Sequence, residues 1–142
     1  LSDEYGIGSD VFSVTSFNEL ARDGQDAERH NMLRPLSERR IPYIANVMSK
    51  EPTIAATDYM RNYAEQIRAF IPAKSYAVLG TDGYGRSDSR ENLRTHFEVN
   101  RHYIVIAALS ELAKLGDVEP EAVNEAISEY KIDINKINPM YC

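Results

Sequence analysis

The Gly80–Arg90 segment holds the residue types most typical of a ligand-binding loop. Its three glycines follow a short apolar strand and precede a predicted helix, and helix N-termini attract anions. Ligands of open α/β sheets bind at this end of the strands. However, the glycines run G-x-x-G-x-G, and no G-x-G-x-x-G or Gly-Lys-Ser/Thr pattern is present. Two interpretations stay open: a phosphate cradle, and a tight loop with Asp82 and Asp88 as turn and cap residues, which the weak motif favours.

The other residues with catalytic potential do not form a recognisable set. The chain has three histidines, His30, His96 and His102. Their spacing matches no zinc motif. There is no G-x-S-x-G nucleophile motif, and Cys142, the single cysteine, is the last residue. Ser87, Ser89 and Arg90 suit an anion, but equally suit caps and surface charge. We therefore predict no catalytic, cofactor-binding or metal-binding residue in this chain.

Composition narrows the class of protein. A chain of 142 residues and 16.1 kDa predicts one domain over residues 1–142. A formal net charge of -6 argues against nucleic acid, because binding to phosphates needs clustered Lys and Arg. One cysteine excludes an internal disulfide. The longest apolar run, Tyr103–Leu109, is far shorter than the ~20 residues of a membrane helix. We expect a soluble cytoplasmic domain.

The order of local patterns favours an α/β fold. β-Branched and aromatic residues predict strands at Val11–Phe17, Thr53–Thr57 and Tyr76–Leu79, with a strand-like Ile41–Met48 beside Pro42. Apolar periodicity predicts helices at Tyr59–Ile71, Ser89–Phe97, Arg101–Leu115 and Pro120–Tyr130, and a helix over Asn18–Leu33 that is broken in two by Asp23-Gly24. Alternating strands and helices indicate layers around a largely parallel sheet.

The helix at Arg101–Leu115 has clear ends and an unusual interior. Asn100 is its predicted cap and Gly116 its predicted terminator. Its first half, Tyr103–Leu109, is apolar on every face, so we expect it to be deeply buried or to lie in an interface. We predict that the chain self-associates as a symmetric pair through this stretch, and that Ile106→Glu weakens the association.

The first residues suggest an incomplete element. Leu1–Asp10 has the pattern of the end of a helix that terminates at Gly6 or Gly8. Domains seldom begin inside an element, so we expect this chain to be a piece of a longer protein.

Three longer stretches carry a family resemblance. They are DVFSVTSFNELARDGQDAERHNML at 10–33, ATDYMRNYAEQIRAFI at 56–71 and the segment 78–116, which includes GTDGYGRSDSRENLR. The chain closely resembles the C-terminal domain of homodimeric pyruvate dehydrogenase subunits of the bacterial type. It differs from the usual family pattern at His30, Tyr84 and Asn100, where Trp, Phe and Asp are customary.

The resemblance implies a fold and a role. The implied fold is transketolase C-terminal-like, a three-layer α/β/α sandwich on a mostly parallel, five-stranded mixed sheet, here without the family's first strand. The whole subunit uses thiamine diphosphate and magnesium to decarboxylate pyruvate oxidatively and to acetylate the lipoyl group of an acetyltransferase. Its cofactor ligands belong to other domains. The resemblance thus implies an inactive structural and dimer-contact domain, with the upstream domains, a second copy and the acetyltransferase as partners.

Two other functions compete with this one. A free-standing regulatory module would bind a small anion at the Gly80–Arg90 loop. An independent small enzyme would need a polar constellation that the sequence does not contain. The distinctive GTDGYGRSDSRENLR stretch favours the structural domain over both.

Overall fold

The computed structural model describes residues 1–142 and contains helices, two strands and two 3-10 turns. In chain order they are α1 (Ser2–Tyr5), α2 (Phe17–Leu33), α3 (Tyr43–Val47), β1 (Thr53–Ala56), α4 (Arg61–Glu65), η1 (Arg68–Phe70), β2 (Tyr76–Leu79), α5 (Arg90–His96), α6 (Arg101–Leu115), α7 (Pro120–Glu129) and η2 (Pro139–Tyr141).

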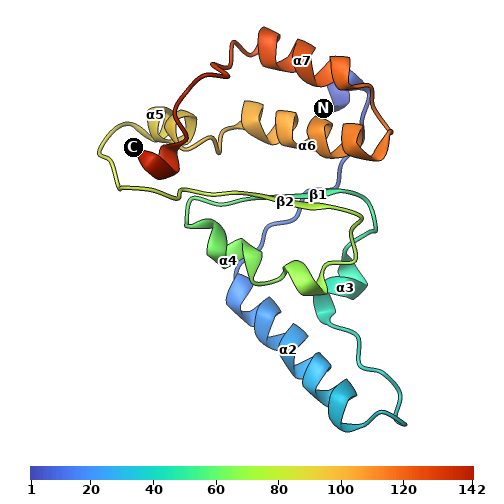
Figure 1. The fold of residues 1–142 in the computed structure, drawn as a ribbon. Coiled ribbons are helices and arrows are strands. Elements are labelled where there is room, and N and C mark those ends of the chain that lie inside the picture. Colours follow the sequence, from blue (N-terminus) through green and yellow to red (C-terminus); the bar gives the residue numbers. More distant parts are fainter.

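The two strands lie in the middle of the molecule with helices on both sides. Figure 1 shows α6 and α7 on one side, and α2, α3 and α4 on the other. Helix α6 contacts both strands, and α4 contacts β2. The C-terminus lies near α5, and α2 extends away from the strands (Figure 1). This arrangement is consistent with the predicted α/β class.

The sheet consists of β1 and β2 in parallel. Thr53 is opposite Tyr76 and Ala56 is opposite Leu79. The Thr53 N–H donates to the Ser75 carbonyl at 3.0 Å, which fixes the start of the ladder. Both of these strands were predicted. The family resemblance implied five strands, whereas residues 1–142 form two.

The predicted strand at Val11–Phe17 is wrong. Residues 11–16 form neither strand nor helix, and Val11 is 91% exposed. The Ser16 hydroxyl accepts a hydrogen bond from the Glu19 N–H at 3.2 Å, so Ser16 caps α2 and Phe17 is its first residue. A β-prone segment forms a strand only when a partner strand pairs with its backbone, and β1 and β2 pair only with each other.

The predicted break at Asp23-Gly24 is also wrong, because α2 is continuous from Phe17 to Leu33. Gly24 is buried within the helix, and the ring of Phe70 fills the space beside it. Gly24 therefore serves close packing rather than a turn.

The strand-like Ile41–Met48 segment is a short helix instead, α3, that buries Ile44. Pro42 precedes the helix, and the carboxylate of Asp23 accepts the Tyr43 N–H at 2.6 Å. An α2 side chain thus supplies a helix-capping partner that the local sequence does not contain.

The predicted helix at Tyr59–Ile71 is interrupted into α4 and η1. The Ala64 carbonyl would accept the Arg68 N–H in a continuous helix, but it accepts the Ile67 N–H at 3.5 Å and the Tyr76 hydroxyl at 2.8 Å. The Arg68 guanidinium donates to the Tyr76 carbonyl at 2.7 Å and lies 5.0 Å from the centre of the Tyr76 ring. Burial raises the pKa of Tyr76 to about 12, so this hydroxyl stays protonated and keeps donating.

Helix α6 agrees with the prediction at both ends. The Asn100 side chain accepts from the His102 and Tyr103 N–H groups at 3.0 and 3.2 Å, and Gly116 is left-handed at φ 80°. No residue of Tyr103–Leu109 is exposed, because the strands lie on one side of α6 and α7 on the other. Leu109 is buried and the other six residues are partly exposed, so the predicted deep burial is confirmed at Leu109 alone.

The buried residues are few and lie mainly beside the strands. The core cluster consists of Ala21, Ile44, Ala64, Ile67, Phe70, Tyr76 and Val78. Between α6 and α7, Leu109 and Ala126 are completely buried. None of the helices combines the length and the apolar character that crossing a bilayer requires.

Candidate functional site

The loop between β2 and α5 is the Gly80–Arg90 segment singled out by its sequence. Its first acidic residue, Asp82, turns back toward α4. One carboxylate oxygen accepts the Arg61 N–H at 3.1 Å, and the other lies 3.5 Å from the Arg61 Nε. Asp82 therefore satisfies a free N–H at the start of α4. The Asp58 carboxylate, just before α4, binds Arg94 at 2.8 Å, which lowers the pKa of Asp58.

Two of the loop's glycines are required by close packing. A Cβ on Gly80 would lie 2.8 Å from the Arg61 backbone nitrogen and 2.9 Å from the Tyr59 carbonyl oxygen. Gly83 has φ +116°, and its Cβ would lie 2.3 Å from the Pro139 carbonyl oxygen. Gly85 has nothing within 4 Å of such a Cβ. Gly80 and Gly83 thus allow α4 and η2 to pack closely against the loop.

A pocket of about 340 Å³ lies where the loop meets α5. It is lined by Arg86, Ser87, Asp88, Asn92, Leu93 and His96. The Asp88 carboxylate accepts from the Ser89 N–H at 2.6 Å and from Asn92 Nδ2 at 2.8 Å, while the Ser89 hydroxyl accepts the Asn92 N–H at 3.3 Å. The expected cap at Asp88 is therefore corrected to Ser89. These contacts occupy the N–H groups of Ser89 and Asn92 at the start of α5.

The remaining groups of this pocket are weak candidates for chemistry. Arg86 and Ser87 have no hydrogen-bonded side-chain partner, and His96 Nε2 is buried without one. Burial, followed by the positive charges of Arg86 and Lys136, lowers the pKa of His96. A neutral imidazole beside Asp88 adds little attraction for an anion, and no nucleophile lies within hydrogen-bonding distance of it.

The remaining histidines and the cysteine lie in separate parts of the fold. His102 stacks on Tyr130 with 4.6 Å between ring centres. His30 lies in the last turn of α2. The Cys142 sulfur contacts only the Asn138 and Pro139 carbonyls, at 3.9 and 4.0 Å. No three His, Cys, Asp or Glu side chains gather closely enough to hold a metal ion.

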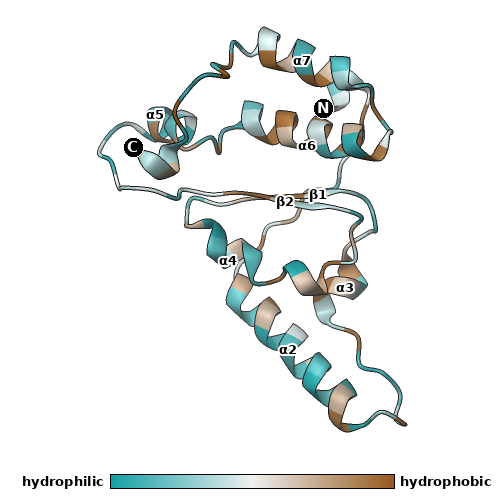
Figure 2. Cartoon of the chain, in the orientation of Figure 1, coloured by the Kyte–Doolittle hydropathy of each residue, from teal (hydrophilic) through white to brown (hydrophobic).

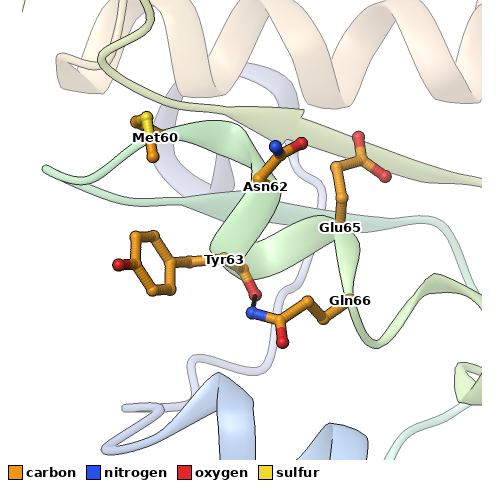
Figure 3. A pocket seen from close by; sticks show the side chains of 5 residues that line it. All are labelled: Met60, Asn62, Tyr63, Glu65 and Gln66. Atoms are coloured by element: carbon orange, nitrogen blue, oxygen red, sulfur yellow. Dashed lines mark hydrogen bonds between the residues drawn. The ribbon is translucent and has the colours of Figure 1, made fainter.

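A second hollow, on α4, had no sequence signal. It has a volume of about 420 Å³ and is lined by Met60, Asn62, Tyr63, Glu65 and Gln66 (Figure 3). The Glu65 carboxylate accepts from Arg68 Nε at 2.6 Å, which lowers the pKa of Glu65. The Gln66 amide donates to Asn18 on α2 at 2.9 Å. Its main polar groups are therefore occupied in joining elements of the fold.

Comparisons with known proteins identify the family of the chain. Residues 1–100 match the model of the transketolase-like TK C-terminal domain. The chain is 61% identical to the pyruvate dehydrogenase E1 component of Escherichia coli strain K12 over 139 residues, which are 98% of the chain and 16% of the relative. The corresponding relative from Haemophilus influenzae is 57% identical over 99% of the chain, and that from Pseudomonas aeruginosa is 54% identical over 100%.

The match covers only a small part of each relative. The chain spans about 16% of the length of these curated relatives, so their names describe much longer proteins. The family model covers residues 1–100, and the alignment with the Escherichia coli relative extends over 98% of the chain. The chain therefore belongs to the family of transketolase-like TK C-terminal domains, in the form that bacterial pyruvate dehydrogenase E1 components contain.

Proposed function

We propose that the chain is a non-catalytic structural domain of a pyruvate dehydrogenase E1 subunit. The observation that carries the proposal is the 61% identity to an E1 component over 98% of the chain. On this proposal the whole subunit decarboxylates pyruvate oxidatively and acetylates the lipoyl group of an acetyltransferase in the cytoplasm. This domain supports the part of the subunit that does the chemistry.

The residues present do not fit thiamine diphosphate and magnesium. Magnesium needs carboxylate oxygens arranged around one point, and no such cluster exists in the chain. A diphosphate needs several cations or free donors around it, but the pocket beside α5 holds a single arginine together with the Asp88 carboxylate. We therefore place the cofactors in other parts of the subunit, and derive no catalytic step from this chain.

The contacts of the Gly80–Arg90 loop support a structural role. Gly80 and Asp82 bind it to α4, Gly83 packs it against Pro139, and Ser89 starts α5. One short segment thus joins elements that are far apart in the sequence. Replacing Gly80, Asp82 or Gly83 would therefore disturb the fold.

The proposal extends to the complete sheet and to the number of subunits. We propose that further strands complete a three-layer sandwich in the whole subunit, and that the subunit is a homodimer. Helices already lie on both sides of the parallel pair (Figure 1). Parallel sheets are normally covered on both faces and contain more than two strands, which supports this completion.

The chain alone should not bind the cofactor. We expect isothermal titration with thiamine diphosphate plus magnesium to give only heats of dilution, because no residue set here can hold either. A whole E1 component from Escherichia coli, titrated in the same buffer, is the positive control. Saturable micromolar binding by the chain would contradict the proposal.

A regulatory anion site is the second candidate function, favoured by the free Arg86 and Ser87 side chains in the pocket beside α5. Titration with inorganic phosphate tests it. Saturable binding that Arg86→Ala abolishes would support this function, whereas heats of dilution alone would eliminate it.

A further inference from the structure

The C-terminal segment that follows α7, residues 131–142, has little burial of its own, and we call it the strap. It runs from the end of α7 to a terminus that lies near α5 (Figure 1). Pro139 is its only buried residue, while Ile134, Ile137 and Tyr141 are at least 67% exposed. Figure 2 shows hydrophobic residues interspersed among hydrophilic ones along it. The strap is therefore not held in place by an apolar core of its own.

Beyond α7, every hydrogen bond between the strap and the rest of the fold comes from one ammonium group. Lys136 Nζ donates to the Thr95 and His96 carbonyls at 3.0 and 2.6 Å. It also donates to Glu98 Oε1 at 3.3 Å and lies 5.7 Å from the centre of the Tyr103 ring. The two carbonyls end α5, where a positive charge is favourable, and hydrogen bonds from a charged donor are strong. Lys136 therefore holds the strap on the C-terminal end of α5.

A second contact joins the strap to the loop between β2 and α5. The Pro139 carbonyl lies so close to Gly83 that a Cβ there would be only 2.3 Å from its oxygen. The Asn138 side chain accepts the Met140 N–H at 2.9 Å and so caps the 3-10 turn that contains Pro139. Gly83 precedes α5 and His96 ends it, so the strap contacts both ends of the loop–α5 unit.

The His96 side chain lies among charges that include the strap's own lysine. Its Nε2 atom is buried and has no hydrogen-bond partner. Two cations act on the imidazole, Arg86 from the loop and Lys136 from the strap. The nearby carboxylates are Asp88, which lines the same pocket, and Glu98, which already binds Lys136. Burial and the two cations lower the pKa of His96, so the imidazole is neutral while the strap is attached.

Protonation of His96 and attachment of the strap therefore oppose each other. An imidazolium would place a third positive charge beside Arg86 and Lys136, and a charged N–H at an atom without an acceptor. Arg86 is exposed and can turn into solvent, whereas the Lys136 ammonium is fixed by its hydrogen bonds. Because the released form has the higher His96 pKa, it binds a proton first and gains stability relative to the attached form as the pH falls below about 6.5.

We propose that the strap is a pH-sensitive element: Lys136 holds it on the loop–α5 unit near neutral pH, and protonation of His96 releases it. Release removes one of the contacts that fix the Gly80–Arg90 loop and leaves its contacts with α4. The rest of the fold stays in place, because the core cluster contains no strap residue and segments with few buried contacts open locally. This device goes beyond the proposed structural role and does not depend on it.

Cleavage by thermolysin, which cuts before isoleucine, measures the released fraction at Ile134 and Ile137, because a protease acts on the locally opened form. Mass spectrometry identifies the cuts within the strap. Each rate is divided by that of a free peptide of residues 131–142 at the same pH, which removes the pH dependence of the protease. We expect the released fraction to rise up to about tenfold from pH 7.5 to pH 5.5, which lies one unit below the usual histidine pKa of 6.5.

Two matched pairs of variants test the roles of Lys136 and His96. Lys136→Met keeps the length of the side chain but removes the charge, so it should raise the released fraction by about tenfold or more at pH 7.5. Lys131→Met, at an exposed position of the same strap, should leave it unchanged. His96→Phe keeps an aromatic ring but cannot bind a proton, so it should abolish the pH response. His102→Phe, the same replacement on α6, should retain the response.

Three results would overturn the proposal: a released fraction that does not change with pH in the unmodified chain, a pH response that survives in His96→Phe, or a Lys136→Met variant cut no faster than Lys131→Met. Circular dichroism at both pH values should show unchanged helix content. Loss of helix at pH 5.5 would mean global unfolding and would also overturn the proposal. A strap that stays attached would leave the proposed function standing, because that function rests on the identity to E1 components.

Discussion

Replacing Gly24 with leucine should lower the free energy of unfolding by about 3 kcal/mol and the melting temperature by roughly 10 °C. A Cβ at this position would lie 2.3–2.5 Å from the ring atoms of Phe70. That ring belongs to the core cluster with Ala21 and Tyr76, so it has little room to move. Leucine would therefore push α2 away from the strands. Thermal unfolding followed by circular dichroism measures the change.

Gln25→Leu is the matched control, because Gln25 is the next residue of α2 and is exposed. It should change the melting temperature by only a few degrees. A Gly24→Leu variant as stable as this control would show that α2 does not pack on Phe70.

Gly83→Val should destabilise the chain by several kcal/mol and release the C-terminal turn. The φ of +116° is a conformation that L-residues adopt only under strain, which typically costs 1–3 kcal/mol. The clash of the new Cβ with the Pro139 carbonyl adds to that strain. Limited proteolysis should cleave the variant near residues 138–142 first, since η2 would lose its contact with the loop.

Gly85→Val controls for the loss of a glycine from the same loop. Its backbone needs no positive φ, and its Cβ would meet nothing within 4 Å. If both valine variants unfolded at the same temperature, the packing of the loop on η2 would be refuted. Unchanged stability of Gly83→Val together with lost activity in a whole subunit would indicate a direct functional role instead.

Sequence alone predicted the elements whose signals are local. The apolar runs of β1 and β2, the Asn100 cap and Gly116 terminator of α6, and Pro120 at the start of α7 all lie next to the elements that they define. These were placed within a few residues of their observed bounds.

The errors arose where distant residues decide the outcome. Gly24 is helical because Phe70, 46 positions later, packs against it, and α4 ends early because Tyr76 takes the Ala64 carbonyl. Asp23 caps α3 from another helix. Residues 11–16 have strand composition but no partner strand. Local patterns contain none of these contacts.

In the candidate site, too, the sequence predicted local features and missed contacts between distant residues. The weak glycine motif favoured a tight loop, and the loop packs on α4 and η2. The capping of α4 by Asp82 was missed, because the two are 21 positions apart. The full exposure of Leu36 was also not predicted, because it depends on how α2 projects from the strands.

Activity of a chimaeric E1 component tests the central claim most directly. The 139 matching residues of the Escherichia coli relative would be replaced by this chain, which is 61% identical to them, and compared with a truncation that lacks them. We predict that the chimaera releases CO2 from pyruvate at a rate close to that of the parent, and that the truncation is unstable and inactive. A truncation with full activity, or a folded chimaera without any, would contradict a structural role for this domain in an E1 subunit.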